Sequence, residues 1–228
     1  MTDKASEKVT FEDVERTRRA FAKKLREFRL QKGRYHHPAP ALAAEKLADC
    51  TMLPNRYDLL DKVAQGGVMA EIGVDTGDFS LEILTRLNPD KLHLFDIDIS
   101  RLVNPAMLEH LGDGTDRVQT HLGDSSTNVL AMPDSYFDMV YIDGDHAYEG
   151  AMKDVMAVLP KMKPNGVVIF NDYTVWSAVS MFHCGVARVV HETCRDHPWK
   201  FRFMGLQTML YNDVMLVRDD TDVAPHLA

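Results

Sequence analysis

The chain has 228 residues, of which 45% are hydrophobic, enough for one substantial core and one α/β domain. Its 34 acidic residues outnumber its 26 basic ones, and the net charge of -8 argues against a nucleic-acid partner. The three cysteines form no CxxC pair, so neither a disulfide framework nor a structural zinc site is predicted. Because neither a signal-peptide core nor an apolar stretch of ~18 residues is present, we expect a cytoplasmic protein with no membrane partner.

Residues 1–56 are predicted to form an N-terminal helical extension. Between Phe11 and Lys32, apolar residues recur with the spacing of an amphipathic helix on an otherwise charged segment. This helix could cover the substrate cleft, form a homodimer by packing on a second subunit, or lie on its own domain, and the pattern fits all three. The prolines at positions 38 and 40 oppose helical structure, so we place His36 and His37 in an extended linker.

Between residues 57 and 218, short apolar runs alternate with helical segments, as expected of a parallel sheet covered on both faces. The first five strands are predicted at Val68–Ile72, Leu92–Phe95, Val118–His121, Phe137–Ile142 and Val167–Phe170. A long helix over Ser177–Asp196 is expected to follow. Two further strands, Lys200–Met204 and Met209–Val217, are joined by so short a connection that they must pair antiparallel.

These elements predict an α/β fold, a Rossmann-like three-layer sandwich. Its sheet would have seven mostly parallel strands, with one antiparallel strand near the C-terminus. The domain would span residues 57–218, and the polar residues 219–228 would form a frayed tail.

A glycine turn, EIGVDTGDFS, joins the first predicted strand to a helix. Ligands of open α/β sheets bind at such strand ends, where Gly73 and Gly77 would let a ligand approach the backbone closely. The turn lacks the GxGxxG spacing, and its aspartates would repel a pyrophosphate, so dinucleotide binding is disfavoured. Glu71 and Asp75 would instead attract a cofactor with sulfonium and ammonium groups. The alternative is that the glycines only make a tight turn.

Carboxylates also follow the second and third predicted strands. The second strand runs into Asp96 and then Asp98, where a carboxylate can accept both hydroxyls of an adenosine ribose, and Asp96 is the first candidate. The third strand ends in a polar cluster that contains Asp124 and Ser125. This cluster could border an adenine ring, cap a helix, or do both.

The order EIGVDTGDFS, LFDID, GDSS, FDMVYIDGDHAYEG and LPKMKPNGVVIFNDY resembles the class I S-adenosylmethionine-dependent methyltransferases over roughly residues 57–218. Within that superfamily, YIDGDHAYEG, KPNGVVIFNDY and GVARVVHE are similar to small-molecule O-methyltransferases of the macrocin type. The resemblance implies an S-adenosylmethionine pocket lined by Glu71, Gly73, Gly77, Asp96 and Asp124. The proline box of nucleic-acid N-methyltransferases is replaced here by DGDH at 143–146, which argues against base methylation.

Oxygen ligands are predicted to converge past the fourth and fifth strands. Asp143, which is also a candidate for cofactor binding, and Asp145 follow the fourth strand, while Asn171 and Asp172 follow the fifth. Hard oxygen donors suit Mg²⁺ or another divalent cation, and catechol-type and macrocin-type enzymes resemble this arrangement. These relatives often have two consecutive acids where this chain has Asn171-Asp172. The alternative is that these residues are only hydrogen-bonding groups.

His146 and Asp143 are the catalytic candidates. A bound metal would lower the pKa of an acceptor hydroxyl, and His146 could accept its proton, although a helix-start residue exposed to solvent fits the sequence equally well. The leading hypothesis is therefore metal-assisted O-methylation of a sugar, polyol or phenolic small molecule. Metal-independent N- or O-methylation and cofactor binding without catalysis are the alternatives. The acceptor pocket could be walled by Tyr173, Trp176, Phe182 and His183, which could equally be core residues.

Overall fold

A computed structural model describes residues 8–31, 38–178, 182–220 and 224–228 of the chain. The chain divides into two compact units, residues 1–37 and residues 38–228. The boundary expected at residue 56 thus lies inside the second unit. The expected linker residues His36 and His37 lie outside the described residues.

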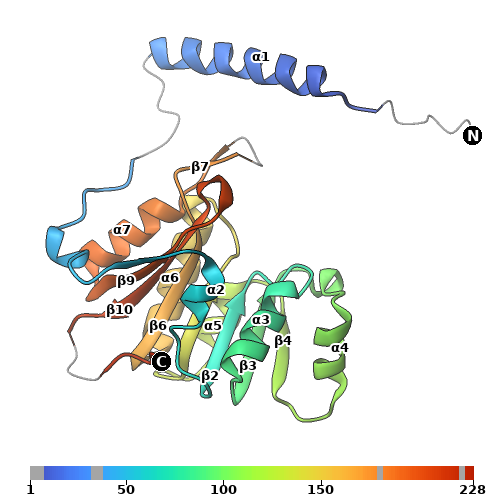
Figure 1. Ribbon diagram of the computed structural model, residues 1–228, viewed down its shortest axis with the longest axis vertical. Coiled ribbons are helices and arrows are strands. Elements are labelled where there is room, and N and C mark those ends of the chain that lie inside the picture. The colour runs from blue at the N-terminus through green and yellow to red at the C-terminus, as the bar shows by residue number, and fades with distance from the viewer. Residues whose placement is uncertain (1–7, 32–37, 179–181, 221–223) are drawn as a thin grey trace, which may run out of the picture. The chain divides into compact units, whose positions relative to one another are not determined.

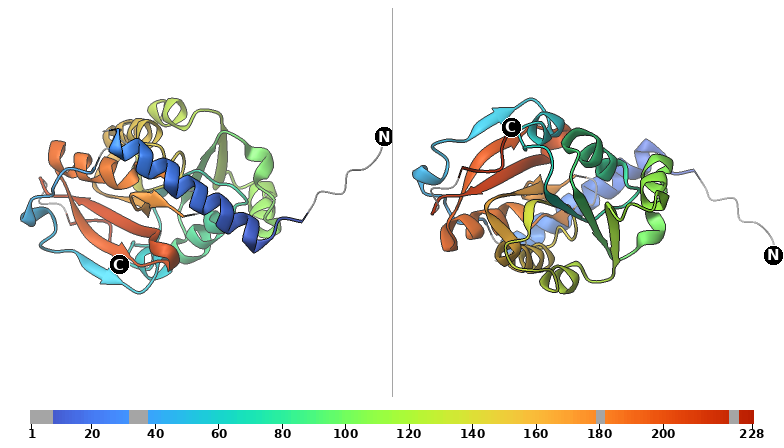
Figure 2. Two further views of the ribbon diagram at one scale, coloured as in Figure 1. Left: turned by 90° about the horizontal axis from the view of Figure 1, so that it is seen from above. Right: turned by 90° about the horizontal axis from the view of Figure 1, so that it is seen from below.

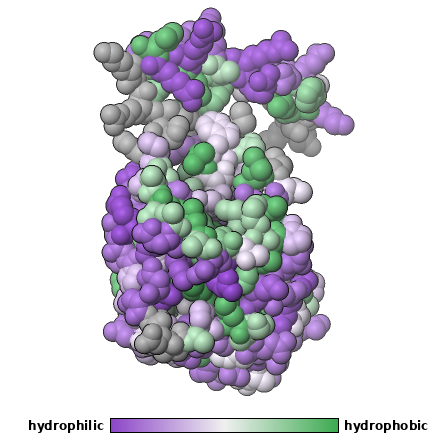
Figure 3. All heavy atoms as spheres, turned by 60° about the vertical axis from the view of Figure 1, so that its left-hand side comes forward, coloured by the Kyte–Doolittle hydropathy of each residue, from purple (hydrophilic) through white to green (hydrophobic). Residues whose placement is uncertain are grey.

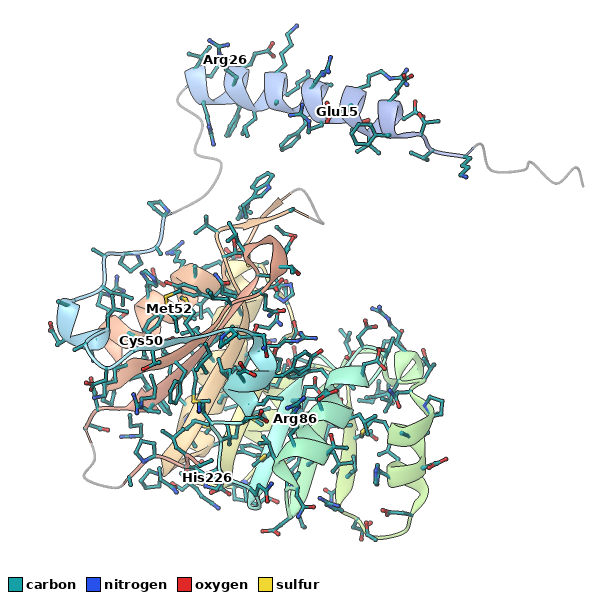
Figure 4. The ribbon with its side chains drawn as sticks, viewed as in Figure 1. Glu15, Arg26, Cys50, Met52, Arg86 and His226 are labelled. Atoms are coloured by element: carbon teal, nitrogen blue, oxygen red, sulfur yellow. The ribbon has the colours of Figure 1, made fainter. Side chains whose placement is uncertain are left out.

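The first unit contains the predicted amphipathic helix, α1, which runs over Phe11–Leu30. It begins with a capping box, in which Thr10 Oγ1 accepts from the Asp13 backbone N–H at 3.3 Å and the Asp13 carboxylate accepts from the Thr10 N–H at 2.9 Å. Within the described residues α1 buries none of its side chains. Charged side chains such as Glu15 and Arg26 project along it (Figure 4). Homodimer formation through this helix stays a prediction.

The second unit is built on an eight-stranded sheet in the order β1-β9-β10-β6-β5-β2-β3-β4 (Figure 1). Its strands are β1 (Thr51–Leu53), β2 (Val68–Ile72), β3 (Lys91–Asp96), β4 (Val118–Leu122), β5 (Phe137–Ile142), β6 (Met162–Tyr173), β9 (Trp199–Gly205) and β10 (Asn212–Arg218). Only β10 runs antiparallel to its neighbours β6 and β9. The predicted fold class, a mostly parallel sheet with one antiparallel strand near the C-terminus, is confirmed.

The eighth strand, β1, was not predicted from the sequence. It pairs in parallel with β9 at the edge of the sheet, from Thr51 opposite Phe203 to Leu53 opposite Gly205. Three residues are too few to show an alternating pattern, so only the pairing reveals the strand. The face that carries this edge gathers hydrophobic residues (Figure 3), and Met52 is 62% exposed there.

Helices pack on both faces of the sheet (Figure 2). One face is covered by α2 (Arg56–Leu60), α3 (Asp78–Leu87) and α4 (Pro105–Gly112), and the other by α5 (Ser125–Leu130), α6 (Tyr148–Val158) and α7 (Val186–Asp196). Short 3-10 helices are η1 (Ala44–Lys46), η2 (Ile99–Arg101), η3 (Leu159–Lys161) and η4 (Thr208–Leu210). All six residues of β5 are buried, because a central parallel strand is covered on both sides. None of the helices within the described ranges is long and apolar enough to cross a membrane.

The helix predicted over Ser177–Asp196 begins nine residues later, at Val186. Before it, β7 (Trp176–Ser177) and β8 (Phe182–His183) form a small antiparallel hairpin. The Gly185 N–H donates to the carbonyl of His146 at 2.8 Å, and the Cys184 N–H donates to the carbonyl of Val175 at 3.2 Å. These tertiary hydrogen bonds replace the local ones that a longer helix would need.

The expected fraying of the C-terminal tail is not seen in residues 224–228. Leu227 forms an antiparallel bridge with Val63, and the Ala228 N–H donates to the carbonyl of Lys62 at 2.9 Å. His226, labelled in Figure 4, donates its backbone N–H to the carbonyl of Asn165 at 2.6 Å. Non-local backbone partners, which composition does not reveal, hold this segment in place.

Candidate functional site

Two adjoining cavities, of about 810 and 830 Å³, open at the carboxyl ends of the parallel strands. The first lies over the glycine turn and the ends of β3, β4 and β5. The second lies over the ends of β5 and β6, the β7–β8 hairpin and the connection from β9 to β10. They share a wall made of Arg56, Asp143, Gly144, Asp145 and His146. This is the position and size at which open α/β sheets bind small ligands.

The predicted glycine turn forms one wall of the first cavity. Gly73 has a φ of 83°, and a Cβ at this position would collide with the backbone of Asp143, so only glycine fits. Gly77, with a φ of 87°, starts α3 and packs against Leu102, and it is not among the described residues that line the cavity. The two predicted glycines therefore differ in role, because only Gly73 lies at the cavity surface.

Of the two aspartates after β3, the structure brings only Asp96 to the cavity. Its Oδ2 accepts from the N–H groups of Val74 and Asp75 at 2.7 and 3.2 Å, which ties the glycine turn to β3. Its Oδ1 accepts from the Asp98 N–H at 2.8 Å. A carboxylate has about four acceptor sites, so capacity remains for a further hydrogen bond from the ribose. Asp98 instead accepts from the Ser100 N–H at 3.1 Å as the N-cap of η2, and it does not line the described cavity wall.

Asp124 and Ser125 both line the first cavity, beyond the end of β4. Asp124 caps α5 by accepting from the Thr127 N–H at 2.8 Å, and Lys153 at 2.7 Å helps to hold its pKa far below the usual range. The Ser125 hydroxyl donates to Asp154 at 2.5 Å. Sequence reasoning missed Asp154, because a buried carboxyl in the middle of α6 has no motif to mark it.

The charge of the first cavity differs from what the residue types suggest. Glu71 is 1% exposed and accepts a hydrogen bond from Ser80, and burial raises its pKa well above the ordinary 4.5. Asp75 is exposed and pairs with Arg101 at 2.5 Å. Both predicted attractors are therefore weaker than their formal charges, because burial raises the pKa of Glu71 and an ion pair offsets the charge of Asp75.

His146 lies in the shared wall between two carboxylates. Its Nε2 is 3.1 Å from Asp143 Oδ1, and its Nδ1 is 3.6 Å from Asp172 Oδ2. The hydrogen bond to Asp143 raises the pKa of His146, while burial raises the pKa values of Asp143 and Asp172. The alternative of a solvent-exposed helix-start residue does not fit, because His146 is partly buried and Ala147 is the N-cap of α6.

The four side chains predicted to hold a divalent cation all line the second cavity, but two of them have other hydrogen-bond partners. The amide of Asn171 is buried and donates to Tyr141 Oη at 2.9 Å, while Asp145 is exposed and accepts from the Ala147 N–H at 2.9 Å. Asp143 and Asp172 are the two remaining candidate ligands, and His146 lies between them. No set of three or more His, Cys, Asp or Glu within the described ranges is arranged to hold a metal. The donor set does not fit the Mg²⁺ site expected from sequence.

Asn171 belongs instead to a buried polar network beneath the second cavity. Asp213 is fully buried and accepts from Tyr141 Oη at 2.7 Å, and burial raises its pKa to about 7. Gln207, which lines the cavity, also donates to Asp213. Sequence reasoning missed this network, because its members come from β5, β6 and β10.

The second cavity has several hydroxyl and amide groups in its wall, although most of its lining surface is apolar. Ser177 Oγ and Tyr211 Oη, both in its wall, lie 3.0 Å apart. Of the aromatic residues predicted to wall the acceptor pocket, His183 does so, whereas Tyr173 Oη bonds to His191 at 2.6 Å. Trp176 is not among the described lining residues, and the side chain of Phe182 lies outside what the structure describes.

Residues 70–173 match the sequence model of a methyltransferase domain, while no curated protein matches the chain. The SAH-bound methyltransferase PaMTH1 of Podospora anserina is 12% identical, with 68% of this chain and 72% of that chain covered and a TM-score of 0.52. For a putative rRNA methylase from Clostridium thermocellum the identity is 13%, the coverage 73% and 97%, and the TM-score 0.56. The pyocyanin biosynthetic protein PhzM is 18% identical over 68% of this chain, with a TM-score of 0.50, and the match spans 51% of its length.

At these identities the solved structures establish the fold alone. The similarity to methyltransferases in sequence comes from the match over residues 70–173. The matched segment contains Gly73, Asp96 and Asp124, which line the first cavity, and Asp143 and His146, which separate it from the second. The cavity over these strand ends has the size and polar groups that an adenosyl cofactor requires. Residues 70–173 therefore resemble a methyltransferase domain, and they lie in a fold that solved methyltransferases share.

Proposed function

We propose that this protein transfers the methyl group of S-adenosylmethionine to a hydroxyl of a small molecule, with His146 as general base and without a divalent metal. The observation that carries the proposal is the position of His146 in the wall shared by the two cavities. A base at this wall would meet an acceptor in the second cavity beside a cofactor in the first. The resemblance to macrocin-type O-methyltransferases supports the same reaction class.

The residues of the first cavity fit the cofactor. Asp96 would hold the ribose, Asp124 and Ser125 would border the adenine, and Gly73 would allow close approach to the backbone. When bound, S-adenosylmethionine supplies an electrophilic methyl group on a positively charged sulfur.

The geometry of His146 supports Nδ1 as the nitrogen that acts as the base. Nε2 lies within hydrogen-bonding distance of Asp143, which favours the tautomer that carries the proton there. Nδ1, at 3.6 Å from Asp172, is too far for a good hydrogen bond and keeps its lone pair for the acceptor hydroxyl. After proton transfer, the carboxylates of Asp143 and Asp172 would stabilise the imidazolium. Positioning of the acceptor would supply the largest part of the rate enhancement.

The lining of the second cavity favours a small neutral acceptor over a nucleic acid. Its wall contains three carboxyl groups, on Asp143, Asp145 and Asp172, against one guanidinium, on Arg56. A phosphate backbone would be repelled by this excess of acids and by the net charge of -8. The hydroxyl and amide groups of Ser177, Gln207 and similar residues can instead bond to a polyhydroxylated or phenolic molecule.

A chelator experiment tests the metal-independent reaction. Release of S-adenosylhomocysteine would be measured over a panel of sugars, polyols and phenols, with EDTA and then with added Mg²⁺. We expect the same turnover in both conditions, because His146 lies between the carboxylates that a cation would need. Loss of turnover in EDTA that Mg²⁺ restores would contradict the proposal. A ribosomal RNA fragment as acceptor tests the substrate class, and its methylation in preference to the panel would count against a small molecule.

A further inference from the structure

We propose that Arg56 binds the carboxylate at the amino-acid end of S-adenosylmethionine. Among the described residues, Arg56 is the only arginine or lysine that lines both cavities. It was not a candidate from the sequence, and it is the first residue of the five-residue helix α2. The inference concerns the cofactor and does not depend on the identity of the acceptor.

The backbone of Arg56 is held firmly at the edge of the sheet. The preceding Asn55 accepts from the N–H groups of Tyr57 and Asp58 at 2.8 and 2.9 Å, which caps α2. The Leu206 N–H donates to the carbonyl of Leu53 at 3.0 Å. A Cβ at Gly205 would lie only 2.9 Å from the carbonyl oxygen of Asn55, so glycine permits this close approach. A guanidinium on such a fixed segment is preorganised for a ligand.

The side chain of Arg56 is positioned by stacking and not by an ion pair. Its guanidinium carbon is 4.5 Å from the ring centroid of Phe79, which also lines the first cavity. The other two cations of that cavity are engaged, Arg101 with Asp75 at 2.5 Å and Lys153 with Asp124 at 2.7 Å. No ion pair within 4.0 Å joins Arg56 to a carboxylate in the described ranges. The donors of Arg56 are therefore available to an anionic ligand.

The strand order indicates which part of the cofactor reaches Arg56. Along the sheet edge the order is β4, β3, β2 and β5, so Asp124, Asp96, Gly73 and Asp143 follow one another in space. With adenine beside Asp124 and ribose at Asp96, the amino-acid tail extends towards the wall shared by Asp143 and Arg56. Arginine binds carboxylates through two parallel N–H donors, which gives both orientation and strength.

Calorimetry with two ligands tests this role on the full chain. S-adenosylhomocysteine carries the amino-acid carboxylate, whereas 5′-methylthioadenosine shares its adenosine and sulfur but lacks that carboxylate. For Arg56→Gln we expect binding of S-adenosylhomocysteine to weaken about 10- to 100-fold, and binding of methylthioadenosine to change less than about twofold. Arg56→Lys should fall between, because lysine keeps the charge but loses the bidentate geometry.

Arg86 provides the matched control. Arg86, on α3 (Figure 4), has its guanidinium carbon 5.2 Å from the ring of Tyr57. It is paired with Glu82, however, and lies outside the described lining of both cavities. Arg86→Gln should leave both affinities unchanged. If Arg56→Gln weakens both ligands equally, or neither, the assignment is overturned. If the unmodified protein binds neither ligand, the cofactor assignment itself is overturned, and that outcome is distinct from a failure of Arg56 alone.

Discussion

The two cavities meet at one wall but are built in different ways. Most of the first cavity comes from strand ends and the turns that directly follow them, as with Asp96, which bonds to the glycine turn, and Asp124, which caps its own helix. The second is assembled from distant segments, around Arg56, His146, residues 171–177, residues 183–184 and residues 207–211. The ends of adjacent strands thus shape the first cavity, whereas the packing of more distant segments shapes the second. A common cofactor can be held by local motifs while the acceptor site varies with the packing around it.

Substitution of His146 should have the largest effect, and it should distinguish the roles of the two cavities most clearly. We expect His146→Gln to lower kcat about 10²- to 10⁴-fold, because glutamine cannot accept the acceptor proton. Binding of S-adenosylhomocysteine should change little, since the ribose and adenine contacts lie elsewhere. Steady-state kinetics and calorimetry on the same preparation measure both effects. A variant that loses cofactor binding and turnover in parallel would mean that the shared wall belongs to the first cavity alone.

The strands beneath the first cavity should make the protein sensitive to acid. His93, on β3, is buried 2.9 Å from His121 and 3.2 Å from Tyr136, and burial together with the neighbouring histidine lowers its pKa from 6.5 to about 4. The unfolded chain would therefore take up a proton near pH 6.5 that the folded chain does not accept until about pH 4. Stability is complete above pH 6.5 and falls by up to about 3 kcal/mol as the pH drops towards 4.

Urea unfolding as a function of pH measures this dependence. His93→Phe should flatten the slope between pH 6.5 and 4, whatever its effect on the absolute free energy of unfolding. His110→Gln, on α4 and outside this cluster, is the control and should keep the slope of the unmodified protein. An unaltered slope in the His93 variant would place the acid sensitivity elsewhere in the fold.

The smallest of these effects is expected for substitutions of Asp96 and Asp98. Their comparison tests whether a single carboxylate at the end of β3 holds the cofactor. Asp96→Asn should weaken S-adenosylhomocysteine binding about 10- to 100-fold, because the amide loses charge and one acceptor for the ribose hydroxyls. Asp98→Asn should weaken it less than about twofold, since Asp98 only caps η2. Calorimetry on the two variants decides between them, and equal losses would show that the turn as a whole holds the cofactor.

Periodicity and local motifs were sufficient for the centre of the sheet and for the cofactor side of the site. The bounds of β2 and β5 agree with those predicted, because buried parallel strands are continuous apolar runs that end in glycine or polar residues. Asp96 and Gly73 could be placed at one edge because parallel strands end together. The positions of these residues follow from chain order and strand direction alone.

What only the tertiary structure decided is where distant segments meet. β1 and the β7–β8 hairpin are too short to have a pattern, and their pairing partners lie elsewhere in the chain. Asn171 was expected to face a cation, but Asp213 on the antiparallel strand β10 and Tyr141 on β5 engage its amide. Burial raises the pKa of Glu71, and Arg56 is far from every motif. Sequence by itself determined the central parallel strands and the sheet edge at which they end, while burial and non-local hydrogen bonds determined the strand order and the surroundings of each side chain, because these depend on neighbours that only folding supplies.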